Sequence, residues 1–219
     1  NTLAAFRQGI ADGADWLELD VQENADGDVV VVHDRDFMRV ARRETHVFQI
    51  TGSELRDLDV GSFFAPAFAD QRVPTLRDVL EQVKGRAGLF IELKYYGHDQ
   101  ALERKVVDLV EAAGMTSRTV IMSLEYDGIR KTAEMRPQWT YGLLNAVAIG
   151  DLTRLQVDFL ALAAKGATYS TIRRAHRRGL KVYAWTINDP IQMWVMMSRG
   201  VDGIITDRVA LARQVMDLR

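Results

Sequence analysis

The sequence of 219 residues contains no cysteine, which excludes disulfides and thiolate metal sites. Positive and negative charges nearly balance, and the net charge of −2 argues against non-specific nucleic-acid binding. No stretch approaches the roughly 18 consecutive apolar residues of a membrane span. What is present, 47% apolar and 26% charged residues, is the composition of a soluble globular domain with a substantial core.

Strand-like and helix-like stretches alternate along the chain, which predicts an α/β fold with a parallel sheet and helical crossovers. We expect strands at 16–21, 28–33, 88–94, 118–124, 139–144, 157–163, 180–187 and 203–206, and helices at 1–12, 75–84, 99–114, 126–136, 150–155, 168–179, 189–199 and 208–218. Asp26-Gly27 predicts a hairpin between the first two strands, so one of them runs antiparallel to its neighbour.

Seven strands then remain for the parallel sheet, and the helix at 1–12 has no strand before it. Because a closed (β/α)8 barrel has eight strands, we predict a TIM barrel whose first strand is missing from this chain. An open doubly wound sheet is the alternative, although no glycine-rich phosphate loop follows an early strand. Residues 35–74 lack barrel periodicity, and we expect a small insertion after the first βα unit within one domain, 1–219.

Acidic residues interrupt two of the apolar strands. In WLELDV, Glu18 and Asp20 share one face, because side chains alternate along a strand. In GLFIELK, Glu92 and Lys94 share a face in the same way. All four lie near the carboxyl ends of their strands, where barrel active sites are built, so we expect them to converge.

Three carboxylates in one pocket repel each other, and a divalent cation would remove the repulsion. Ligands that are all oxygen favour Mg²⁺ or Ca²⁺ over Zn²⁺. The alternative is a structural ion-pair network in which Lys94 neutralises one acid. Buried charges are a costly way to gain stability, so we favour the metal site.

A histidine follows the two acids at the end of the hairpin's second strand. His33 lies within a short hairpin of Glu18 and Asp20, and its pKa suits proton transfer near neutral pH. A lone histidine is more often structural than catalytic, but this placement favours catalysis.

The chain resembles the glycerophosphodiester phosphodiesterase family. The matching stretches occur in the family's order and cover essentially the whole chain; they are NTLAAF, ADWLELDVQENADGDVVVVHD, VPTLRDVL, IELK, YAWTIND and GVDGIITD. The resemblance implies a TIM barrel with a small insertion, a divalent metal, and hydrolysis of a glycerophosphodiester to an alcohol and glycerol 3-phosphate.

The resemblance also assigns roles to individual positions. It implies metal binding by Glu18, Asp20 and Glu92, acid–base catalysis by His33, and substrate binding by Lys94, Ser123 and Trp185. Trp185 fits a core aromatic equally well, because barrel interiors are packed with side chains.

The family pattern begins with a strand ending in His-Arg-Gly and continues with Pro-Glu-Asn-Thr, whereas this chain starts at the asparagine of the second motif. We therefore expect a fragment that lacks the first catalytic histidine, which puts the activity of this exact chain in doubt. YYGHDQ and LLNAVAIGD resemble the branch with an N-terminal membrane region, which implies membrane attachment of a longer parent.

Two other functions stay open. A phospholipase-D-like lyase on the same barrel would make a cyclic phosphate. A non-catalytic barrel would be retained for binding or scaffolding, but a decayed site would be expected to have lost some of Glu18, Asp20, His33, Glu92 and Lys94.

Overall fold

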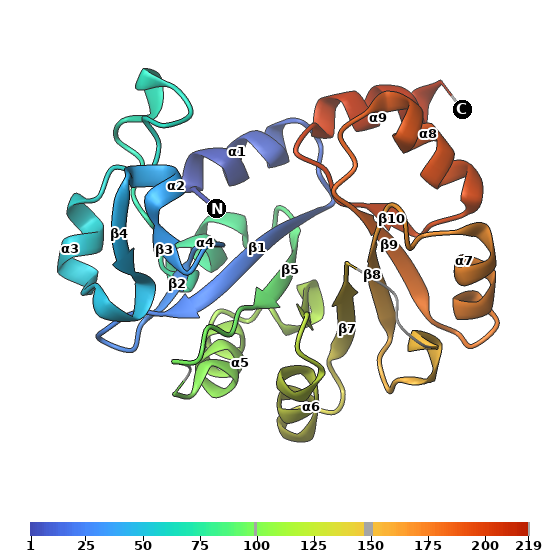
Figure 1. Cartoon of the computed structure of the whole chain (residues 1–219), viewed down its shortest axis with the longest axis horizontal. Coiled ribbons are helices and arrows are strands. Elements are labelled where there is room, and N and C mark those ends of the chain that lie inside the picture. Colours follow the sequence, from blue (N-terminus) through green and yellow to red (C-terminus); the bar gives the residue numbers. More distant parts are fainter. Residues whose placement is uncertain (99, 147–150, 219) are drawn as a thin grey trace. The chain divides into compact units, whose positions relative to one another are not determined.

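The computed structural model describes residues 1–98, 100–146 and 151–218 (Figure 1). Parts of the helices expected at 99–114 and 150–155, and of the two stretches that resemble the membrane branch, lie outside the described residues. The chain forms two compact units, one of residues 1–120 and 130–139 and the other of residues 121–129 and 140–219. Each unit is described by itself.

The first unit contains a sheet, its covering helices and a small lobe. Its elements are α1 (Leu3–Ala11), β1 (Trp16–Glu23), β2 (Val29–Val31), β3 (Asp36–Phe37), α2 (Met38–Ala41), β4 (Arg43–His46), η1 (Val47–Gln49), α3 (Gly52–Asp57), η2 (Pro66–Phe68), α4 (Leu76–Val83), β5 (Gly88–Leu93), α5 (Leu102–Ala112) and η3 (Thr116–Arg118). The strand order is β5-β1-β2, with β5 parallel and β2 antiparallel to β1. The hairpin prediction is confirmed, although β2 is shorter than the expected 28–33.

The two faces of β1 differ in the way that the alternation predicts. Leu17, Leu19 and Val21 are buried on one face. Leu17 lies against α1, because a Cβ added at Gly9 would come within 2.9 Å of its Cδ2 atom. The apolar face of β1 therefore packs on helix, which leaves the acidic face for the site.

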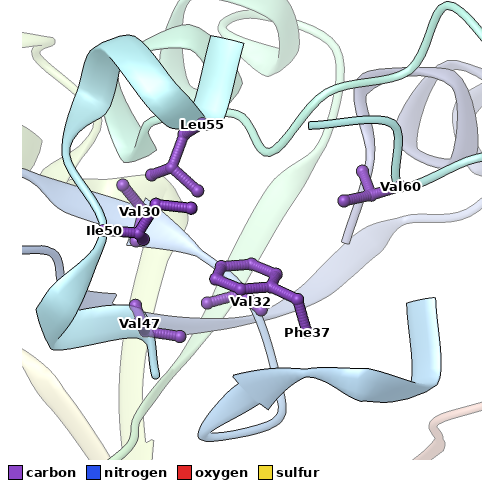
Figure 2. Close-up of a cluster of buried hydrophobic side chains, with 7 residues drawn as sticks. All are labelled: Val30, Val32, Phe37, Val47, Ile50, Leu55 and Val60. Atoms are coloured by element: carbon purple, nitrogen blue, oxygen red, sulfur yellow. The ribbon is translucent and has the colours of Figure 1, made fainter. Parts of the chain in front are cut away.

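Residues between β2 and α4 form a lobe that packs on the hairpin through a buried apolar cluster (Figure 2). Phe37 and Ile50 are fully buried there, and Val30 of β2 packs with them. Thr51 caps α3, and Glu54 completes the capping box by accepting from the Thr51 backbone N–H at 3.0 Å. This cluster therefore joins the lobe to the hairpin that ends at His33.

The second unit repeats a strand–helix alternation. Its elements are β7 (Thr140–Asn145), η4 (Leu152–Arg154), β8 (Phe159–Ala163), α7 (Tyr169–His176), β9 (Lys181–Trp185), α8 (Pro190–Arg199), β10 (Gly203–Ile204) and α9 (Val209–Asp217), and the chain passes between the units at β6 (Thr119–Ser123) and α6 (Tyr126–Met135). The order β10-β9-β8-β7 is parallel throughout. The helix expected at 150–155 is a 3-10 turn over its described part, and the last strand is two residues shorter than expected.

Candidate active site

Strand pairing brings the acidic residues of β1 and β5 together. In the parallel register, Asp20 lies opposite Glu92 and Glu18 lies opposite Phe90. The carboxylates of Glu18, Asp20 and Glu92 each offer an oxygen within 4.8 Å of the other two. The convergence predicted from side-chain alternation is therefore present in the structure.

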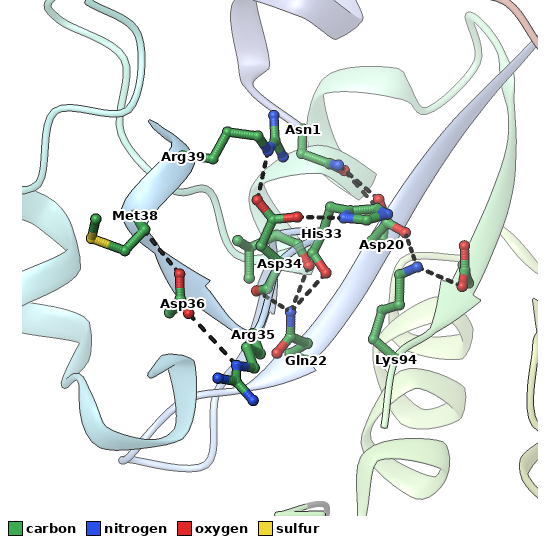
Figure 3. A network of polar contacts seen from close by, with 12 residues as sticks. Asn1, Asp20, Gln22, His33, Asp34, Arg35, Asp36, Met38, Arg39 and Lys94 are labelled. Carbon is green, nitrogen blue, oxygen red and sulfur yellow. Dashed lines mark hydrogen bonds and ion pairs between the residues drawn. The ribbon is translucent and has the colours of Figure 1, made fainter. Parts of the chain in front are cut away.

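Lys94 lies against two of these carboxylates, just beyond the end of β5 (Figure 3). Its Nζ atom is 2.7 Å from Glu92 Oε1 and 3.3 Å from Asp20 Oδ1. Asp20 and Glu92 are buried, and the Lys94 side chain is 9% exposed. One ammonium thus pairs with two carboxylates of a cluster of three, so the positive charge of Lys94 does not balance the cluster when all three are ionised.

The carboxyl groups show the electrostatic strain expected of such a cluster. Burial, with the nearby charge of Asp20, raises the pKa of Glu92 from 4.5 to about 7, against the opposing effect of the adjacent Lys94 ammonium. Burial, with the charges of Asp20 and Glu92, also raises the pKa of Glu18 well above its usual value. A cation that bound here would relieve this repulsion.

Two buried oxygens of the cluster, Asp20 Oδ1 and Glu92 Oε1, make ion pairs with Lys94 but no hydrogen bond of good geometry. Burial alone would lower the pKa of Lys94, but the charges of Asp20 and Glu92 raise it, so the lysine stays protonated. The donor set is all carboxylate oxygen, which fits a hard divalent cation such as Mg²⁺ or Ca²⁺. Glu18, Asp20 and Glu92 are the residues that could hold it.

Asn1 is a member of the site that the sequence analysis did not identify. Its side-chain amide donates to Asp20 Oδ2 at 2.8 Å, and its amide oxygen accepts from the Asp20 backbone N–H at 3.1 Å. These two contacts fix the orientation of the Asp20 carboxylate. They join residues 19 positions apart, and no local sequence pattern predicts such a pair.

His33 lies at the edge of the cluster, because the preceding residue, Val32, donates its backbone N–H to the Asp20 carbonyl at 3.0 Å. The imidazole is half exposed, and its Nδ1 is 2.7 Å from Asp34 Oδ1. Arg39 donates to the other Asp34 oxygen at 2.6 Å. These two hydrogen bonds outweigh the effect of burial and lower the pKa of Asp34, so Asp34 is a carboxylate.

A charged acceptor at Nδ1 has a chemical consequence. A carboxylate can only accept, so the His33 Nδ1 carries the proton and Nε2 of the neutral ring keeps its lone pair. His33 was predicted from the sequence, but the hydrogen bonds that join it to Asp34, and Asp34 to Arg39 of the lobe, were not.

A small pocket adjoins the cluster. It is lined by Gln22, Glu23, Phe48, Lys94, Tyr96, His98 and Leu102. The rings of Phe48 and His98 are stacked with centroids 3.4 Å apart. Lys94 borders both the pocket and the carboxylates, so a group bound in the pocket would lie next to the cluster.

Ser123 and Trp185 belong to the second unit. Ser123 is fully buried at the end of β6, and its hydroxyl accepts from the Glu125 backbone N–H at 3.0 Å. The Trp185 indole, half-buried at the end of β9, donates to the Ala161 carbonyl at 2.9 Å. Their roles in substrate binding stay predictions.

The sequence of the whole chain is similar to that of known proteins. The family model described as the glycerophosphoryl diester phosphodiesterase family matches residues 1–211. A glycerophosphodiester phosphodiesterase of Caldanaerobacter subterraneus is 32% identical over 217 residues, which cover 94% of this chain and 88% of that protein.

Solved structures show the same fold. A glycerophosphodiester phosphodiesterase from Agrobacterium tumefaciens superimposes with a TM-score of 0.85 at 28% identity, covering 98% of this chain and 93% of that one. A phosphodiesterase of Oleispira antarctica, solved with its product sn-glycerol-3-phosphate, gives a TM-score of 0.93 at 23% identity, with 99% and 91% coverage. These likenesses confirm the predicted TIM barrel fold class and exclude the open doubly wound sheet.

Proposed function

The chain belongs to the glycerophosphoryl diester phosphodiesterase family and is a phosphoric diester hydrolase, and we propose that a divalent metal and His33 carry out its reaction. The substrate is a small glycerophosphodiester, and the products are an alcohol and glycerol 3-phosphate. The observation that carries the proposal is the convergence of three carboxylates, two of which pair with one lysine.

Glu18, Asp20 and Glu92 would hold the metal, and Mg²⁺ and Ca²⁺ fit their oxygen ligands. When bound, the metal supplies charge neutralisation at a phosphate oxygen and lowers the pKa of a hydroxyl or water. Asn1 orients the Asp20 carboxylate, and Lys94 adds a positive charge where negative charge develops on the phosphorane.

His33 would move the proton at its Nε2 atom. The Asp34 carboxylate holds the Nδ1 proton and fixes the ring, while Arg39 holds Asp34. The half-exposed imidazole can then take a proton from the nucleophile or deliver one to the leaving alkoxide. Substrate binding by Ser123 and Trp185 is part of the proposal and rests on the family resemblance of these positions.

We also propose that residues 1–219 act as one catalytic domain in which the segment of about 35–74 is an insertion. The proposal is supported by two observations. The segment packs on the hairpin through a buried apolar cluster, and Arg39, which holds the partner of His33, comes from the segment. The lobe would then serve catalysis by fixing Asp34.

The experiment is an assay of glycerol 3-phosphate release from glycerophosphocholine by the full-length protein that contains these residues, with Mg²⁺ or Ca²⁺, with a chelator, and with Glu18→Gln. We expect turnover that the chelator and the substitution each reduce by about 100-fold or more, because the metal supplies several kcal/mol of transition-state stabilisation. Glu81→Gln, on the exposed face of α4, is the matched control and should retain activity.

Other outcomes would point elsewhere. A cyclic phosphate as the accumulating product, detected by ³¹P NMR, would favour the lyase reaction. Absence of both turnover and Mg²⁺ or Ca²⁺ binding by calorimetry would overturn the proposal and leave a non-catalytic binding barrel.

A further inference from the structure

The segment that carries His33 leaves the sheet just after the hairpin. The antiparallel pairing of β1 and β2 ends with the Val32 N–H bonded to Asp20. The carbonyl groups of residues 32–34 lie beyond the paired residues of β1 and β2. Their hydrogen-bond partners therefore determine how precisely His33 is held.

One side chain serves three consecutive carbonyl groups in this segment (Figure 3). Gln22 Nε2 donates to the carbonyls of Val32 at 2.9 Å, His33 at 3.3 Å and Asp34 at 2.8 Å. Gln22 is buried, with 6% of its surface exposed. An amide NH₂ has two protons, so at least one of these contacts shares a proton with another.

A second donor reaches the same segment from the other strand. Tyr96 lies just after β5, and its hydroxyl donates to the His33 carbonyl at 3.0 Å. The backbone of His33 is thus bonded both to a side chain of β1 and to a side chain beyond β5. These two strands also supply the three carboxylates.

We propose that Gln22 and Tyr96 are positioning residues that hold His33 at a fixed place relative to the carboxylate cluster. Gln22 shares the strand face of Glu18 and Asp20, so a single strand fixes both the metal ligands and the histidine segment. The inference rests on the proposed function, in which His33 transfers the proton.

Removal of the donors tests the proposal. Gln22→Met keeps a similar length and removes the NH₂, and Gln22→Glu places an acceptor against three carbonyl oxygens. We expect kcat to fall roughly 10- to 100-fold in Gln22→Met and further in Gln22→Glu, because small misplacements of a catalytic group cost that much. The affinity for Mg²⁺ alone, measured by calorimetry, and KM should change less than about threefold.

Tyr96→Phe is the milder variant, because Tyr96 is partly exposed and loses only a hydroxyl. We expect kcat to fall several-fold. Tyr95→Phe is its matched control, because the neighbouring Tyr95 hydroxyl donates to Glu103 and not to the histidine segment. The double variant Gln22→Met/Tyr96→Phe should deviate from additivity, since both residues hold one segment.

The outcomes separate this inference from the proposed function. If His33→Gln keeps full activity, the histidine role in the proposed function is wrong, and the positioning role falls with it. If His33→Gln is inactive but Tyr96→Phe and a folded Gln22→Met both have the kcat of the wild type, the positioning role alone is wrong. If Gln22→Met does not fold, Tyr96→Phe against Tyr95→Phe decides the matter by the same criterion.

Discussion

At the scale of single residues, the acidic cluster is built at a cost in stability. Glu92 is buried beside Asp20, and its pKa of about 7 means that the ionised form is disfavoured in the folded protein. Residues that serve binding or catalysis often carry such costs, because the arrangement that suits a ligand is not the one that suits the ligand-free fold.

Glu92→Gln should reveal this cost. With chelator at pH 8, we expect the free energy of unfolding to rise by about 1–3 kcal/mol, because a neutral amide removes the repulsion and the buried charge. With Mg²⁺, the same variant should lose about 100-fold or more in kcat/KM. Urea unfolding and the glycerol 3-phosphate assay measure the two effects.

Glu103→Gln provides the contrast for that measurement. Glu103 is also buried, but it accepts from the Tyr95 hydroxyl at 3.0 Å and pairs with Lys131 at 3.3 Å. Its substitution should not stabilise the protein. A Glu92→Gln variant that is less stable than the wild type in chelator would contradict the electrostatic account of the cluster.

At the scale of elements, β1 and the lobe have separate tasks. One face of β1 packs on α1 through Leu17, and the other carries Glu18, Asp20 and Gln22. The lobe supplies Arg39 to the partner of His33. The lobe can hold Arg39 at Asp34 only if the buried cluster around Phe37 keeps the lobe in place.

Phe37→Ala tests the dependence of the lobe on its core. Phe37 is fully buried at the centre of the cluster in Figure 2, so we expect a loss of about 3–5 kcal/mol in the free energy of unfolding, measured in urea. Hydrogen exchange should increase first in residues 36–60. Phe63→Ala, at a side chain that is 53% exposed, should change stability by less than about 0.5 kcal/mol.

Phe37→Leu is the variant to use if Phe37→Ala does not fold. It should lose less stability and still increase exchange in the lobe. Equal protection of the lobe in the wild type and in both variants would show that the cluster does not hold it.

At the scale of the whole molecule, the cluster links stability to pH and to metal. The pKa of Glu92 is 4.5 unfolded and about 7 folded, so the folded protein binds more protons between these values. In chelator, this group's contribution to stability should therefore be greatest below about pH 4.5. It should fall by about 3 kcal/mol as the pH rises through 7.

Saturating Mg²⁺ should oppose this loss, because metal binds the ionised carboxylates. At a free Mg²⁺ concentration 100 times its dissociation constant, we expect the free energy of unfolding to rise by about 2.7 kcal/mol at pH 8 and by little at pH 5. Thermal unfolding across this pH range, with and without chelator, measures the difference. A metal effect that is equal at both pH values would contradict the link.

Among the described residues, no helix has the length and apolar character needed to cross a membrane. The two compact units divide the predicted site residues between them, with the carboxylates, Lys94 and His33 in the first and Ser123 and Trp185 in the second. The predictions above on stability and metal therefore concern the first unit.

The sequence by itself determined the fold class and most of the carboxylate site. Strand and helix alternation is a local property, and Asp26-Gly27 determines a hairpin by turn geometry alone. The period of two along β1 and β5 determined that Glu18, Asp20, Glu92 and Lys94 face one way. The same period also places Gln22 on this face.

The tertiary structure decided the contacts between segments that are distant in sequence. Asn1 meets Asp20, and Tyr96 meets the carbonyl of His33, 63 positions away. A hydrogen bond depends on atoms being within about 3 Å in space, and no periodicity of the chain specifies that distance between elements.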